Sequence, residues 1–206
     1  MKYAKKITPT DKTLSQQLMD DGWKKLKEPS NLCMATLLSI PFAFLLGGIT
    51  IGIICFLKPA LFDFLKANSF GIVFNIDFKI VLYIVVLFVF MIIHELIHAI
   101  FIPNFVQSDN TCFGINGLFG FVSTTEPLKK GRFIVISFMP FFILSVIFPI
   151  VLNLFQLLNG YMLFLCLLNA MGSCVDFLNI MLIFFQVPNG SIVINNGFET
   201  FYSNVK

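Results

Sequence analysis

Two histidines and a glutamate stand close together in an otherwise apolar stretch of the sequence. His94 and His98 are four residues apart, and Glu95 directly follows the first of them. On a helix, residues four apart share one face, so both imidazoles can bind a single metal ion. Glu95 lies beside them, where its carboxylate can take a proton from a water molecule. Since these are the only two histidines of the chain, the pattern predicts one metal site with hydrolytic chemistry.

The sequence around this motif has the composition of a membrane protein. Hydrophobic residues make up 57% of the chain and charged residues only 12%, whereas soluble domains contain about 25% charged residues. Crossing the bilayer core requires about 20 helical residues. Four stretches are long and apolar enough, at roughly 31–57, 79–102, 133–158 and 161–186. We therefore predict an all-α integral membrane protein with four transmembrane helices.

This setting bears on the meaning of the motif. The alternative to a metal site is a set of helix residues that neighbouring polar groups satisfy. At the centre of a membrane span an ionisable side chain costs about 3 kcal/mol unless it is paired or coordinated. Three of them within five residues therefore favour a metal site, and we expect one Zn²⁺ per chain.

Positive charges predict the orientation of the spans, because short cytoplasmic segments are rich in Lys and Arg. With the N-terminus inside, eleven of the 14 basic residues lie on the cytoplasmic side and three lie outside. We expect both termini to be cytoplasmic. The domain organisation then consists of a cytoplasmic or interfacial segment (1–30), a four-helix membrane domain (31–186) and a short cytoplasmic tail (187–206).

A third ligand is needed, because catalytic zinc usually has three protein ligands and one open position for water. Without a third histidine it must be Asp, Glu or Cys, and Asp176 is the only acid in the other three spans. His94 and Asp176 both lie about 15 residues inside their spans from the same side, at the same depth of about 22 Å. Cys174 and Glu126 are the alternatives, but Cys174 is two positions from Asp176 and so points to another face.

Other residues are candidates for substrate binding. Asn169 lies two helical turns before Asp176, and we expect it to hydrogen-bond the substrate or a metal ligand, or else to serve helix packing. Asn116 and Gly117 stand between apolar runs, a pattern that predicts a tight turn in a β-hairpin-like cytoplasmic loop. The strand edge of that loop could bind an extended peptide. Pro140 and Pro149 are expected to kink the third helix.

The motif, the hairpin loop, and the Asn and Asp of a later helix together resemble the core of the site-2 proteases, the intramembrane zinc metalloproteases. Four spans, a short chain and the Gly172-Ser-Cys-Val-Asp176 sequence are most similar to small bacterial membrane proteins of the zincin type. The resemblance covers roughly residues 78–186. It implies that His94, His98 and Asp176 are zinc ligands and that Glu95 is the catalytic base. Site-2 proteases have Pro after the Asn and Gly after the Asp, whereas Gly172 and Phe177 stand at those places here.

These observations predict a zinc-dependent intramembrane peptidase in which Glu95 is the general base for a zinc-activated water. The alternatives are a non-catalytic zinc-binding scaffold and a proton or metal transporter. The partners are then the lipid bilayer and a membrane-protein or peptide substrate, while the basic residues do not form a nucleic-acid footprint. The bias toward Lys, Asn, Ile and Phe, with a single Arg, is typical of AT-rich bacteria, so we expect a multi-pass protein of a bacterial cell membrane.

Overall fold

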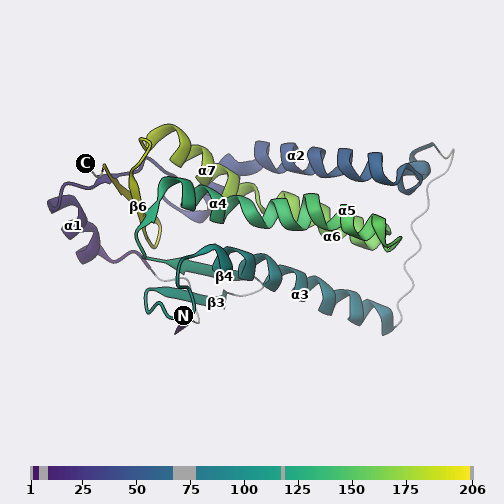
Figure 1. Ribbon diagram of the computed structural model, residues 1–206, viewed down its shortest axis with the longest axis horizontal. Coiled ribbons are helices and arrows are strands. Elements are labelled where there is room, and N and C mark those ends of the chain that lie inside the picture. The colour runs from purple at the N-terminus through teal and green to yellow at the C-terminus, as the bar shows by residue number, and fades with distance from the viewer. Residues whose placement is uncertain (1, 5–8, 67–77, 117–118, 205–206) are drawn as a thin grey trace.

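Four long apolar helical segments make up about half of the chain (Figure 1). The computed structural model describes residues 2–4, 9–66, 78–116 and 119–204. Helix α2 (Leu32–Leu57) forms the first segment and α3 (Phe78–Phe101) the second. The third, Lys130–Leu154, consists of α4 (Lys130–Phe141), the π-helical η2 (Phe142–Ile147) and α5 (Phe148–Leu154). The fourth, Gly160–Gln186, consists of α6 (Gly160–Gly172) and α7 (Cys174–Gln186).

The prediction of four long apolar helices is confirmed. The first two agree with the expected ranges to within one residue, and the third begins and ends a few residues earlier than expected. It ends at Leu154 because Gln156 adopts a positive φ of 58°, which turns the chain out of the helix. Asn159 then begins α6 by accepting hydrogen bonds from the backbone N–H groups of the first turn.

Neither of the last two segments is a continuous α-helix. In the third, Pro140 and Pro149 flank the π-helical stretch. Where a kink was predicted, the backbone hydrogen bonds thus change from the α-helical to the π-helical pattern. The fourth, expected as one helix, is interrupted at Ser173, whose ψ is 5°. The Ser173 hydroxyl donates to the carbonyl of Asn169, 2.9 Å away, a contact that tends to bend helices.

The helices are arranged with α2 and α3 on opposite sides of the paired third and fourth segments (Figure 1). Most of their surface is apolar and exposed, as shown by Phe56 at 88% and Phe44 at 72% exposure. Buried apolar side chains between α3, η2 and α6 form the packing nearest to the histidines, namely Phe90, Ile97, Leu144 and Leu165. The outward-facing apolar surface is what lipid-facing helices have.

A three-stranded sheet lies beside the end of α3 that carries the histidines (Figure 1). Its order is β1-β3-β4, with β1 (Lys2–Tyr3) parallel to β3 (Thr111–Asn116) and β3 antiparallel to β4 (Phe119–Thr124). Asn116 pairs with Phe119, which confirms the predicted hairpin. Gly117, in the expected turn, lies outside the described residues.

A second sheet joins the two ends of the chain and was not predicted. Its order is β2-β7-β6-β5. The strands are β2 (Lys24–Lys25), β5 (Leu128–Lys129), β6 (Ile192–Asn196) and β7 (Glu199–Ser203). Helix α1 (Lys12–Asp20) packs on this sheet through Leu18, which contacts the cluster of Ile194 and Phe201. The N-terminal segment and the C-terminal tail, predicted as separate parts, therefore pack on each other.

Polar contacts reinforce this terminal unit, which we define as α1, β2, β6 and β7. The Asn196 amide donates to the Asp11 carbonyl at 2.7 Å and to the Ser15 hydroxyl at 2.9 Å. On the side of the long apolar helices, the Lys130 ammonium donates to the carbonyls of Phe184 and Val187 at the end of α7. Positive charge at a helix C-terminus is favourable, so these contacts attach α7 and α4 to the same end of the molecule.

The terminal unit gives a prediction for Phe201, which is completely buried. Phe201→Ala removes the ring against which Leu18 packs, and we expect it to destabilise the unit by about 3–5 kcal/mol. Trp23, the only tryptophan, packs against the same cluster, so its fluorescence during urea unfolding measures this loss. Phe198→Ala is the control because that ring is 45% exposed. Equal unfolding midpoints for the two variants would contradict the assignment.

Candidate metal centre

Three side chains from two segments meet at one point beside α3. The Nε2 atoms of His94 and His98 lie 3.6 and 3.5 Å from the same Asp176 oxygen, Oδ2. The two histidines come from successive turns of α3, and Asp176 comes from the first turn of α7, just after the interruption at Ser173. Their side chains are only 13–22% exposed. Among the described residues this is the one cluster with metal-ligand composition.

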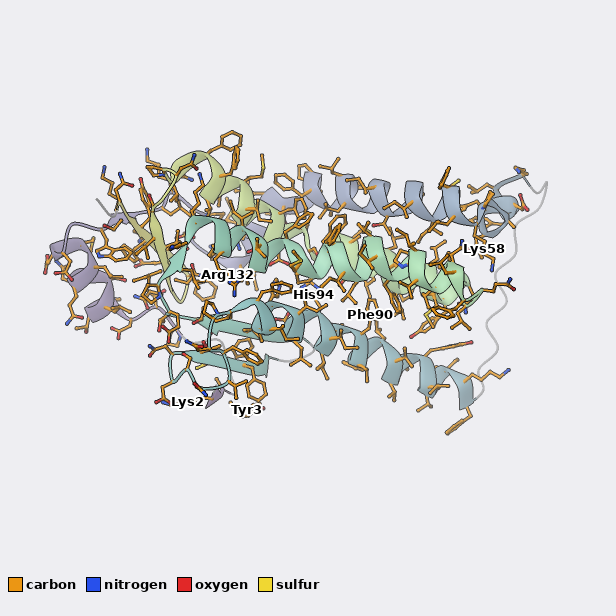
Figure 2. All side chains as sticks on the ribbon, viewed as in Figure 1. Lys2, Tyr3, Lys58, Phe90, His94 and Arg132 are labelled. Atoms are coloured by element: carbon orange, nitrogen blue, oxygen red, sulfur yellow. The ribbon has the colours of Figure 1, made fainter. Side chains whose placement is uncertain are left out.

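The second ring nitrogen of each histidine is held by an oxygen atom. His98 Nδ1 lies 2.9 Å from the carbonyl oxygen of Ile136 on α4. A carbonyl only accepts, so His98 Nδ1 is the donor. His94 Nδ1 lies 2.8 Å from Asn169 Oδ1 on α6. Figure 2 shows His94 on the side of α3 that faces the third segment.

The orientation of the Asn169 amide follows from its other neighbours. Its nitrogen, Nδ2, lies 3.2 Å from the Pro140 carbonyl and 2.8 Å from the Ser145 hydroxyl. Because the Pro140 carbonyl can only accept, the amide nitrogen must face it, and the amide oxygen must face His94. Ser145 in turn donates to the Cys166 carbonyl at 2.8 Å. His94 Nδ1 is therefore also a donor, so in the neutral form of either ring the lone pair that a metal ion needs is on Nε2.

This donor set fits zinc. Two neutral imidazole nitrogens and one carboxylate oxygen are the ligands found in many catalytic zinc sites, and three protein ligands leave a fourth position open. Ligand atoms about 2.1 Å from a tetrahedral ion are about 3.4 Å apart. The separations of 3.5 and 3.6 Å are close to that value, and all three ligand atoms lie within 4.8 Å of one another. Histidine ligands usually donate their other N–H to an oxygen acceptor, as both rings do here.

Glu95 lines a cavity next to the cluster. The cavity has a volume of about 310 Å³ and lies between α3, α6 and β4, with His94, Glu95, Gly120 and Asn169 as its polar and small lining groups. A Cβ at residue 120 would come within 2.7 Å of Glu95 Cγ. The absence of a side chain at Gly120 thus allows β4 to lie directly on Glu95.

The remaining candidates lie elsewhere. Cys174 Sγ is 3.1 Å from the Ser39 hydroxyl on α2, facing away from the cluster as its position in the helix predicted. Glu126 accepts hydrogen bonds from Ser108 and Asn110 in the loop before the third segment. Of the expected substrate-binding residues, Asn169 contacts a predicted ligand, Asn116 ends β3, and Gly117 is outside the described residues.

Several groups at the site were not identified in the sequence. The Ile136 carbonyl is a backbone acceptor, the Ser145 hydroxyl is a single polar side chain, and Gly120 is one glycine of the hairpin. None of the three belongs to a recognisable motif. Pro140 did offer a signal. A proline within a helix leaves the carbonyl four residues earlier without its N–H donor, which points to Ile136.

Metal content provides a direct check. We expect purified protein to hold about one zinc per chain, and Asp176→Ala to lose most of it because two imidazoles alone form an incomplete site. Elemental analysis after dialysis against a weak chelator measures this. Cys174→Ala, two residues away and facing Ser39, should keep its zinc. Full occupancy in Asp176→Ala together with loss in Cys174→Ala would reverse the ligand assignment.

Comparison with known proteins agrees with this chemistry at the family level. A family model described as "Putative zincin peptidase" matches residues 87–192, just over half of the chain. No curated protein and no solved structure matches it. The matched range contains both histidines, Glu95 and Asp176. The chain belongs to this family of zincin-type peptidases, for which a zinc metallopeptidase activity is indicated.

Proposed function

We propose that the protein is a zinc-dependent intramembrane peptidase that hydrolyses a peptide bond of a membrane-protein substrate, with the catalytic plan of the site-2 proteases. The observation that supports this most is the position of Glu95, which lines a cavity beside the three converging ligand atoms. A site with only a structural metal is closed and has no need of an adjacent carboxylate. The setting within long apolar helices supports a substrate that is itself in the membrane.

In this proposal each residue has one task. His94, His98 and Asp176 hold the ion, and a bound zinc would polarise the scissile carbonyl and the attacking water. Glu95 accepts the proton of that water at its carboxylate and then delivers it to the leaving amine nitrogen. Asn169 orients the His94 ring through Nδ1.

The substrate backbone is proposed to bind along β4. One edge of β3 is taken by β1, and no described strand pairs with the outer edge of β4. Through Gly120 this strand borders the same cavity as Glu95. An extended peptide that adds to such an edge gains main-chain hydrogen bonds, which offset the loss of its helical ones. The hairpin with Asn116 at its end is therefore the substrate-binding element.

The cavity also suggests the kind of side chain that is accepted next to the scissile bond. Apart from the polar site residues, its lining is apolar and comes from Leu87, Phe90, Met91, Leu168 and Gly172. A cavity of about 310 Å³ with such a lining suits a large aliphatic or aromatic side chain. We assign this role to the cavity as part of the proposal.

The orientation in the bilayer is proposed from the charge distribution. Both sheets and both termini lie at the same end of the helices, near the histidine end of α3 (Figure 1). Placing this end in the cytoplasm of a bacterial cell puts most basic residues inside. The site then receives water from the cytoplasmic side.

Replacement of Glu95 tests the mechanism. Glu95→Gln keeps the size of the side chain but cannot accept a proton, so zinc content should be unchanged while hydrolysis falls by about 100-fold or more. The substrates are co-expressed single-span membrane proteins. Their cleavage is measured as the appearance of a fragment that only the wild type produces. Glu126→Gln is the matched control, since the described hydrogen bonds of the Glu126 carboxylate go to Ser108 and Asn110, away from the metal ligands.

Two outcomes would contradict the proposal. If Glu95→Gln cleaves as fast as the wild type, Glu95 is not the general base. If the wild type binds zinc but yields no Glu95-dependent fragment in the whole membrane proteome, the protein is a zinc-binding scaffold instead.

Replacement of Gly172 tests the cavity. A Cβ at Gly172 meets no atom within 4 Å, so Gly172→Leu fills the cavity without disturbing α6. We expect cleavage of substrates with Leu or Phe beside the scissile bond to fall about tenfold or more, while substrates with Ala there are retained. Gly48→Leu on α2, where a Cβ is equally unobstructed, should change neither. A uniform loss for all substrates would contradict the assignment.

Labelling of Cys112 tests the orientation. In a variant with Cys112 as its sole cysteine, a membrane-impermeant thiol reagent should react only after the cells are opened. Asp63→Cys in η1 (Pro59–Lys66), at the other end of α2, should react in intact cells. The reverse pattern would place the site on the outer side.

A further inference from the structure

Pro140 occupies the point at which α4 passes into the π-helical stretch. It is completely buried, as is Pro149 in the same segment. In an α-helix the N–H of residue 140 would donate to the carbonyl of residue 136. Proline has no N–H, so the Ile136 carbonyl loses this donor. A buried carbonyl without a donor is costly, and another donor must reach it.

His98 supplies that donor. Its Nδ1 lies 2.9 Å from the Ile136 oxygen, and this contact leaves Nε2 facing Asp176 Oδ2 at 3.5 Å. An ordinary residue at position 140 would bring its own N–H to the same oxygen and compete with the histidine. The missing N–H of Pro140 is therefore a requirement for the ring orientation of His98.

The carbonyl of Pro140 serves the other histidine. It accepts from Asn169 Nδ2 at 3.2 Å, which turns Asn169 Oδ1 toward His94 Nδ1 at 2.8 Å. Pro140 thus acts on both rings. The N–H that it lacks leaves the Ile136 carbonyl free for His98, and its own carbonyl orients Asn169 toward His94.

We propose that Pro140 is a positioning residue for the metal centre, which fixes both histidine rings with Nε2 toward Asp176 by freeing the Ile136 carbonyl and presenting its own. This inference rests on the proposed zinc site. The simpler view, that Pro140 only bends the helix or fills space, applies equally to Pro149. That second proline is buried to the same degree, and none of the described contacts of His94 and His98 involves it.

The experiment compares residues at position 140 that differ in the N–H alone. Pro140→Ala introduces the N–H, whereas replacing Pro140 by lactic acid, the hydroxy acid analogue of alanine, places an ester oxygen there. With purified full-length protein, competition against a chromophoric chelator gives the zinc affinity. We expect Pro140→Ala to bind zinc about 10- to 100-fold more weakly, the lactic acid variant to recover most of the affinity, and Pro149→Ala to remain within about twofold of the wild type.

Thermal unfolding of the zinc-free proteins separates positioning from folding. Alanine is favoured over proline within a helix, so Pro140→Ala should be at least as stable as the wild type while it binds zinc less well. A wild-type affinity in Pro140→Ala overturns the proposal. Equal losses in the alanine and lactic acid variants overturn it as well, since the ring and not the N–H is then what matters.

A measurement on the unaltered protein covers the case in which the Pro140 variants do not fold. Nitrogen-15 NMR of the zinc-loaded wild type should show the His98 proton on Nδ1. A proton on Nε2 overturns the proposal. If the wild type binds no zinc, the proposed function itself fails, an outcome distinct from wild-type binding that is insensitive to residue 140.

Discussion

Polar atoms among apolar helices need partners, and the arrangement around the histidines follows from this constraint. An unpaired donor or acceptor in such surroundings costs about 1–3 kcal/mol. Both Nδ1 atoms, the Asn169 amide and the Ser145 hydroxyl all have partners. Within the described part of the chain, Thr50 Oγ1 is the one buried side-chain N or O atom without a hydrogen bond. The atoms at the centre that remain available to a metal ion are His94 Nε2, His98 Nε2 and Asp176 Oδ2, which face a common point.

The irregular parts of the helices are where these partners come from. Pro140 and the π-helical stretch release carbonyls and bring Ser145 beside Asn169. The interruption at Ser173 separates α6, which carries Asn169, from α7, which carries Asp176. Local departures from ideal helix geometry are common at functional sites. Here they allow the fourth segment both to orient the His94 ring through Asn169 and to bring the Asp176 carboxylate close to that ring.

The position of α3 depends on the same contacts. Its outer face is largely exposed, and only 11% of its most apolar stretch is buried. On the inner face, hydrogen bonds from His94 and His98 join it to α6 and α4, and β4 packs on it through Gly120. In the proposed membrane setting, such a helix borders lipid on one side and the cavity on the other. A substrate can then reach β4 from the plane of the bilayer.

The sequence was sufficient for the features that depend on composition and helical period. Runs of apolar residues located the helices, and the spacing of His94 and His98 with the matching depth of Asp176 predicted three side chains that the structure brings together. Their roles as ligands and that of Glu95 as base stay predictions. The terminal unit was missed because long-range pairing, such as Asn196 with Asp11, leaves no local pattern. The role of the Ile136 carbonyl was missed because every residue has a backbone carbonyl, so the residue type does not show which carbonyl binds a side chain.

X-ray absorption at the zinc edge tests the central claim, that two imidazoles and one carboxylate converge on a single ion. For purified wild-type protein with about one equivalent of zinc, we predict a first shell of nitrogen and oxygen alone at about 2.0–2.1 Å, with the outer-shell scattering of two imidazole rings. A sulfur shell at about 2.3 Å, or a single imidazole, would contradict the account.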